Sequence, residues 1–141
     1  MNLSPTADPI VASAARWFWW IAGLSLVNTV MFYSGSEASF VVGLGMTTLA
    51  SVLLAGNMAL ALGAVALILG FYFLMGLYGQ RGAAWAFYAG ITMYVLDALI
   101  YVKLDSWLSV AFHGYAIFCI ARGVMRLREL GQAPVAANDS V

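Results

Sequence analysis

The chain has 141 residues, of which 64% are hydrophobic and only 9% are charged, and its formal net charge is zero. Soluble domains carry about 25% charged residues, so this composition predicts an integral membrane protein. The sequence has no basic stripe with interleaved aromatic residues, which argues against nucleic acid as a partner. Its single cysteine excludes an internal disulfide.

Four apolar runs have the length of about 20 residues that crosses a bilayer as a helix. They cover residues 13–33, 57–78, 83–102 and 107–125, within a predicted transmembrane domain of residues 13–130. Residues 1–12 have no basic segment ahead of the first apolar run, so we expect a polar tail rather than a cleaved secretory signal. Residues 131–141 are small and polar, which predicts a disordered C-terminal tail.

The segment 39–56 is also apolar, and charge placement decides whether it is a fifth span. With four spans, Glu37, Lys103 and Asp105 lie on one side and five arginines on the other. The positive-inside rule then places both termini in the cytoplasm, in a bacterial inner membrane. A fifth span would divide the positive charge. We therefore predict an all-α protein with four transmembrane helices and one re-entrant or interfacial helix on the outer face. The arginines are Arg16, Arg81, Arg122, Arg126 and Arg128.

Small residues form a stripe along the second predicted span. Such spacing lets a neighbouring backbone approach closely, but it does not say which helix the neighbour is. Packing within the bundle is the preferred interpretation, and a homo-oligomer interface is the alternative. The stripe consists of Gly56, Ala59, Gly63, Ala66 and Gly70.

Basic residues lie at and just after the end of the last span. Arg122, Arg126 and Arg128 are predicted to form an interfacial collar that attracts anionic lipid headgroups. Membrane lipids are therefore expected partners of the chain.

Two ionisable residues interrupt the third and fourth spans. Asp97 lies eight residues before the turn at Asp105, and His113, the only histidine, lies eight after it. At 1.5 Å per residue, both lie about 10–12 Å below the outer end of the hairpin. Asn28 is expected in the same layer, and Tyr94 and Tyr101 flank Asp97 at helical spacing. These five residues are the candidate polar pocket, in the outer third of the bilayer.

An ionised carboxylate in hydrocarbon costs about 2.5–3.5 kcal/mol, so Asp97 is expected to face protein and to be paired. The preferred interpretation is a structural clasp that fixes helix register. The alternative is a small cavity that holds a ligand, a proton or a headgroup. The sequence leaves open whether the Asp97–His113 pair is neutral or ionic.

The sequence gives little support for a specific catalytic or metal-binding chemistry. One histidine and one aspartate fall short of the three or four ligands of a zinc site, and no serine lies in a GxSxG context. No catalytic residue, metal or cofactor is assigned. We expect a non-enzymatic transport or membrane-complex subunit. The alternatives are a membrane-embedded enzyme or binding protein for a lipid, quinone or haem that uses His113 and Asp97, and a structural assembly factor.

Overall fold

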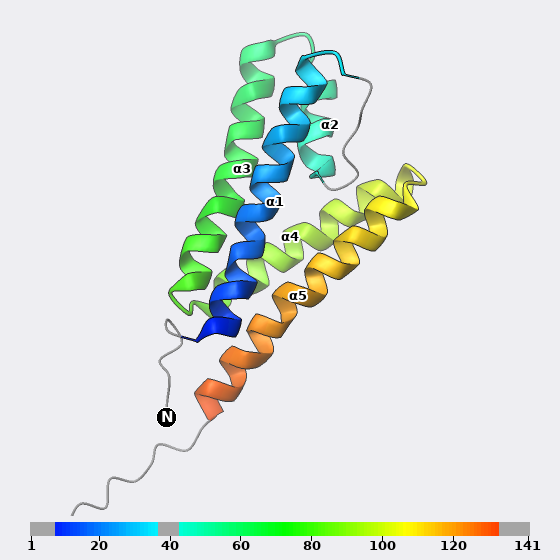
Figure 1. Cartoon of the computed structure of the whole chain (residues 1–141). Coiled ribbons are helices and arrows are strands. Elements are labelled where there is room, and N and C mark those ends of the chain that lie inside the picture. Colours follow the sequence, from blue (N-terminus) through cyan, green and yellow to red (C-terminus); the bar gives the residue numbers. More distant parts are fainter. Residues whose placement is uncertain (1–7, 37–42, 133–141) are drawn as a thin grey trace, which may run out of the picture.

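The computed structural model describes residues 8–36 and 43–132, which form five helices and, within these ranges, no strand (Figure 1). The tail residues 1–7 and 133–141, Glu37 and the first part of the predicted segment 39–56 lie outside the described residues. Four helices are long and apolar enough to cross a membrane, as predicted. The helices are α1 (Pro9–Tyr33), α2 (Gly45–Leu53), α3 (Met58–Gln80), α4 (Ala84–Lys103) and α5 (Trp107–Gln132).

Two helices are longer than the sequence pattern predicts. α1 begins at Pro9 rather than at residue 13, because Asp8 caps it: Oδ1 accepts the N–H groups of Ile10 and Val11, at 2.9 and 3.2 Å. Proline suits the first helical position because it needs no hydrogen-bond acceptor there. At the other end, α5 continues to Gln132 rather than ending near residue 125.

The helix α2 occupies the middle of the predicted segment 39–56. Its nine residues span about 13 Å, well short of the about 30 Å of a bilayer core. In Figure 1, α2 begins close to α4 and runs back toward the start of α3, beside the upper parts of α1 and α3.

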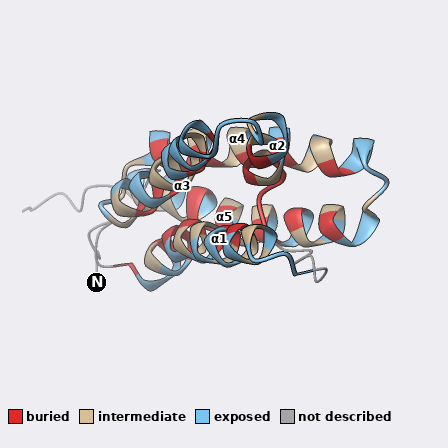
Figure 2. Ribbon diagram, turned by 90° about the horizontal axis from the view of Figure 1, so that it is seen from above, coloured by how far each residue is buried: buried red, intermediate tan, exposed pale blue. Residues whose placement is uncertain are grey.

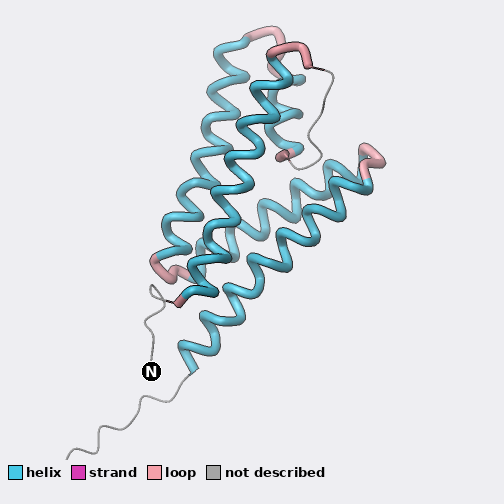
Figure 3. Tube along the Cα trace, viewed as in Figure 1, coloured by secondary structure: helices cyan, strands magenta, loops and turns pink. Residues whose placement is uncertain are grey.

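Tight turns, pink in Figure 3, end three of the long helices. In each turn, the N–H two residues beyond the cap returns to a carbonyl of the last helical turn, which is the Schellman pattern. This pattern needs a left-handed residue, and the three are Gly35, Gly82 and Asp105, with φ of 75°, 77° and 53°.

α1 contacts α3 along one side and α5 along another, and α4 packs mainly on α5 and α3. α4 and α5 form an antiparallel hairpin whose tip leans away from α1 and α3, and α2 lies in the space between (Figure 1). Buried residues, red in Figure 2, lie on the faces that the helices turn toward one another. The largest buried side chains include Phe18, Tyr72, Phe87, Tyr94 and Ile120.

Glycines allow the closest helix contacts, but not those of the predicted stripe. A Cβ on Gly76 would overlap Trp19, and one on Gly90 would overlap Phe18. A Cβ on Gly63, in contrast, would meet nothing within 4 Å in the described part of the chain. The same holds for Gly56 and Gly70, and the stripe lies mostly on an exposed face of α3. The described helices therefore do not use this stripe for packing, and an interface between copies remains a prediction.

Candidate functional site

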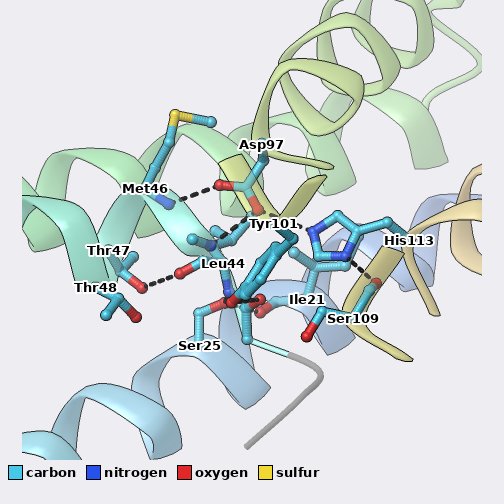
Figure 4. Close-up of polar contacts among 12 residues, drawn as sticks. Ile21, Ser25, Leu44, Met46, Thr47, Thr48, Asp97, Tyr101, Ser109 and His113 are labelled. Carbon is cyan, nitrogen blue, oxygen red and sulfur yellow. Dashed lines mark hydrogen bonds and ion pairs between the residues drawn. The ribbon is translucent and has the colours of Figure 1, made fainter. Parts of the chain in front are cut away.

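The centre of the site is the carboxylate of Asp97 on α4, which is hydrogen-bonded to two other elements (Figure 4). Oδ2 accepts the N–H of Gly45 at 2.9 Å and lies 2.8 Å from Nε2 of His113. Oδ1 accepts the N–H of Met46 at 2.7 Å. The side chains of Asp97 and His113 are both 0% exposed. The carboxylate thus joins α4, α5 and the start of α2.

Asp97 acts as the cap that α2 lacks in its own sequence. The residue at the N-cap position is Leu44, which makes no side-chain cap bond. The first N–H groups of any helix have no partner within that helix, and the helix dipole favours a negative group beside them. The carboxylate of Asp97 meets both requirements across more than 50 residues of sequence.

His113 is held at both ring nitrogens. Nδ1 lies 2.8 Å from the carbonyl oxygen of Ser109. A carbonyl can only accept, so Nδ1 carries a proton. One more proton is shared between Nε2 of His113 and Oδ2 of Asp97. Whichever atom holds it, the pair has zero net charge, which is the state that a buried site tolerates best.

Two tyrosines of α4 enclose the imidazole. Tyr94 stacks on His113 with ring centroids 4.3 Å apart, and Tyr101 lies tilted at 5.1 Å. The hydroxyl of Tyr101 donates to the carbonyl of Gly43 at 2.9 Å. The buried hydroxyls of Tyr94 and Tyr72 have no hydrogen-bond partner among the described residues. Tyr101 therefore anchors the chain ahead of α2, while Tyr94 contributes its ring.

Polar side chains satisfy the non-helical backbone just before α2. Besides the bonds from Gly45 and Met46, the N–H of Leu44 donates to Oγ of Ser25 at 2.9 Å. The Oγ1 of Thr47 donates to the carbonyl of Leu44 at 2.8 Å. Ser25 is a site residue that sequence analysis missed, because a lone serine in an apolar helix commonly bonds its own preceding turn. Here it does that too, at 2.7 Å to Ile21.

The predicted pocket residues lie around the Asp97–His113 pair or the segment ahead of α2, on different sides. Tyr94, Tyr101 and Asp97 contact His113 directly. Asn28 reaches the segment from α1, with Nδ2 3.4 Å from Oγ1 of Thr48. It also packs so closely on Gly43 that a Cβ there would lie 2.9 Å from Nδ2. What the cluster encloses is the start of α2.

Next to this cluster, an open groove of about 630 Å³ lies between α2 and the end of α4. Its lining is mostly apolar, with a smaller number of polar side chains. Asn28 and Tyr101 of the predicted pocket line it, but the sequence does not place the groove itself, because it depends on where α2 docks. The lining residues are Asn28, Gly45, Thr48, Leu49, Val52, Ile100, Tyr101, Lys103, Leu104 and Ser106.

At the opposite end of the bundle, the arginines of α5 bind other parts of the chain. Nε of Arg126 lies 2.8 Å from Oδ2 of Asp8, and its Nη1 lies 2.9 Å from Glu129. Arg128 donates twice to the hydroxyl of Tyr88, at 3.1 and 2.7 Å. Arg122 is exposed. Headgroup contacts of these three arginines remain predictions.

The ionised form of the Asp8 carboxylate is stabilised by its neighbours. Desolvation opposes its ionisation, but hydrogen bonds from Arg126 and from the backbone of Val11 and Ile10 outweigh that effect. They lower the pKa of Asp8 below its usual value. The ion pair joins the start of α1 to the end of α5.

The described residues contain no group of three or more His, Cys, Asp or Glu side chains placed to hold a metal ion. Comparisons of the chain with protein-family models, with curated proteins and with solved structures found no match.

Proposed function

We propose that the chain is a multi-pass membrane protein that acts as a non-enzymatic membrane-complex or transport subunit. The four long helices turn large apolar side chains outward, among them Trp20, Leu67, Leu99 and Phe118, and Leu67 is 78% exposed. Exposed apolar surface of this extent is costly in water and favourable in lipid. We place α2 as a re-entrant helix, which is tolerated in a membrane where protein satisfies its backbone.

The proposed orientation is that of the positive-inside rule. The Asp8–Arg126 ion pair joins the start of α1 to the end of α5, so these two ends lie together. The arginines gather at this end, and Lys103 lies at the other, as the last residue of α4. We therefore propose that both termini are cytoplasmic, in an inner membrane, and that α2 faces the outside.

The observation that carries the proposed role is the engagement of Asp97 by three hydrogen bonds in a fully buried site. A general base or a haem ligand needs a ring nitrogen that can reach its substrate or the iron. Both nitrogens of His113 are bonded within the protein. This supports a clasp that holds α2 in place, and it counts against catalysis or haem binding at His113.

The membrane arrangement is tested by cysteine labelling. In a Cys119→Ala background, single cysteines replace Ser34, Ala55 or Gln80, and sealed vesicles are treated with a membrane-impermeant maleimide. A re-entrant α2 places Ser34 and Ala55 on one face and Gln80 on the other. Labelling of Ser34 and Ala55 from opposite faces would show that α2 crosses the membrane.

The proposed role as a complex subunit is tested by measuring the mass of the extracted assembly and the stability of the variants. A complex subunit is expected to migrate far above its 15.1 kDa monomer mass when extracted from its native membrane in mild detergent. If part of that mass is a homo-oligomer through α3, Gly63→Ile lowers it, whereas Leu99→Ile, an exposed change on α4, does not. A monomer with a turnover that His113→Gln abolishes without loss of stability would favour the enzyme alternative.

A further inference from the structure

We propose that the groove between α2 and the end of α4 binds a single-chain lipid with an anionic headgroup. The inference rests on the proposed membrane location, because such a ligand would enter from the surrounding bilayer. The groove belongs to neither the buried Asp97–His113 pair nor the basic end of the bundle.

The walls of the groove fit an acyl chain. Leu49 and Val52 on α2 face Ile100 and Leu104 at the end of α4. Its volume of about 630 Å³ falls in the range of about 300–1,000 Å³ that is typical of small-ligand sites. Three of these four side chains are exposed, which leaves apolar surface for a chain to cover.

The polar part of the lining fits a negatively charged headgroup. Lys103 is the one charged residue among those that line the groove, and hydroxyl or amide groups of Asn28, Thr48 and Ser106 lie along the same groove. Lysine at the end of a spanning helix extends its ammonium toward the interface, where headgroups lie. Charge complementarity therefore selects an anionic amphiphile over a neutral or cationic one.

The groove also shares two residues with the clasp. Gly45 and Tyr101 line it, and Gly45 donates to Asp97 while Tyr101 donates to Gly43. The fit is tight here, since a Cβ on Gly45 would lie 3.1 Å from the ring of Tyr101. A ligand in the groove would thus touch the docked segment and stabilise it, by preferential binding to the folded state.

The test is native mass spectrometry of the full chain in a neutral detergent, titrated with oleate and, separately, with oleyl alcohol. We expect one saturable oleate per chain and a rise in thermal stability with oleate. Val52→Trp fills the groove and is expected to abolish both effects. Leu53→Trp is the matched control, because Leu53 neighbours Val52 and is 72% exposed but does not line the groove.

The contribution of the positive charge of Lys103 to oleate binding is tested by substituting this residue. Lys103→Gln is expected to weaken oleate binding about threefold to tenfold while binding of oleyl alcohol is unchanged, and Lys103→Arg is expected to restore it. Asp105→Asn, in the turn that follows Lys103, controls for nonspecific charge effects. Equal oleate binding by Val52→Trp and Leu53→Trp, or equal affinity for oleate and oleyl alcohol, would overturn the proposal. The cysteine labelling above tests the membrane arrangement without a ligand, so the two failures are distinguishable.

Discussion

Asp97 Oδ2 lies 2.8 Å from His113 Nε2, and the same oxygen accepts the N–H of Gly45. One buried atom therefore links the two helices of the α4–α5 hairpin to a segment more than 50 residues earlier in the chain. This explains why an apolar protein keeps an acid and its single histidine at matching depths. Without the carboxylate, the first turn of α2 would have unpaired N–H groups in the protein interior, which costs about 1–3 kcal/mol per group.

Asp97→Asn is predicted to destabilise the fold, because the amide nitrogen replaces an acceptor with a donor. The expected loss is about 1–3 kcal/mol if the pair is neutral and only the N–H of Gly45 loses its acceptor. It is about 3–5 kcal/mol if a buried ion pair is broken. Reversible unfolding in mixed detergent micelles measures the loss, and its size reports where the shared proton lies.

The control for this change is Asp105→Asn in the exposed turn between α4 and α5. Asn tolerates the left-handed conformation at residue 105 as well as Asp does, so its effect should be close to zero. If Asp97→Asn is no more destabilising than this control, the clasp is not what holds α2.

Tyr101→Phe is predicted to cost about 1–3 kcal/mol, because the buried carbonyl of Gly43 loses its donor. The matched control is Tyr94→Phe, since the hydroxyl of Tyr94 has no partner in the described structure and both rings contact His113. That change is expected to be neutral or stabilising. The same unfolding measurement applies, and a reversed order of the two effects would contradict the assigned hydrogen bond.

The sequence predicts the long helices well because each one is a long apolar run with its own boundaries. It also places Asp97 and His113 together, since two helices that share a short turn keep residues at equal distances from the turn at equal depth. It does not predict that α2 is their third partner. The bonds from Gly45 and Met46 use backbone groups, which leave no trace in residue type, and the sequence lacks a local cap at Leu44.

The glycines also show that a pattern within one helix does not predict which other helix packs against it. Spacing alone singles out the stripe with Gly63, yet the helices of the described chain approach one another at Gly76 and Gly90. Regular spacing shows that one face of a helix carries small side chains. The large side chains of the neighbouring helix decide which of these faces it packs against. Trp19 and Phe18 of α1 lie against Gly76 and Gly90, and neither contact follows from a pattern within one helix.

Gly90→Ala and Gly63→Ala are predicted to have opposite effects on stability. A Cβ at residue 90 overlaps the ring of Phe18, so the α1–α4 packing must shift, at a cost of about 1–3 kcal/mol. A Cβ at residue 63 meets open space in the described chain, and alanine favours a helix by about 0.5–1 kcal/mol over glycine. Unfolding of both variants at low protein concentration tests this. Strong destabilisation by Gly63→Ala would instead indicate that another copy packs on the stripe.

Acid is predicted to weaken the end of the bundle where Asp8 binds Arg126. Because the pKa of Asp8 is lowered in the folded protein, its contribution to stability is complete above the unfolded value of about 3.9. It shrinks as the pH falls below that value and is lost below the folded pKa. Asp8→Asn keeps a residue that can cap α1 but removes the charge. The variant should therefore lose less stability than the wild type between pH 5 and pH 3, as measured by thermal unfolding in a nonionic detergent. Equal losses would show that the ion pair contributes nothing to stability at this end.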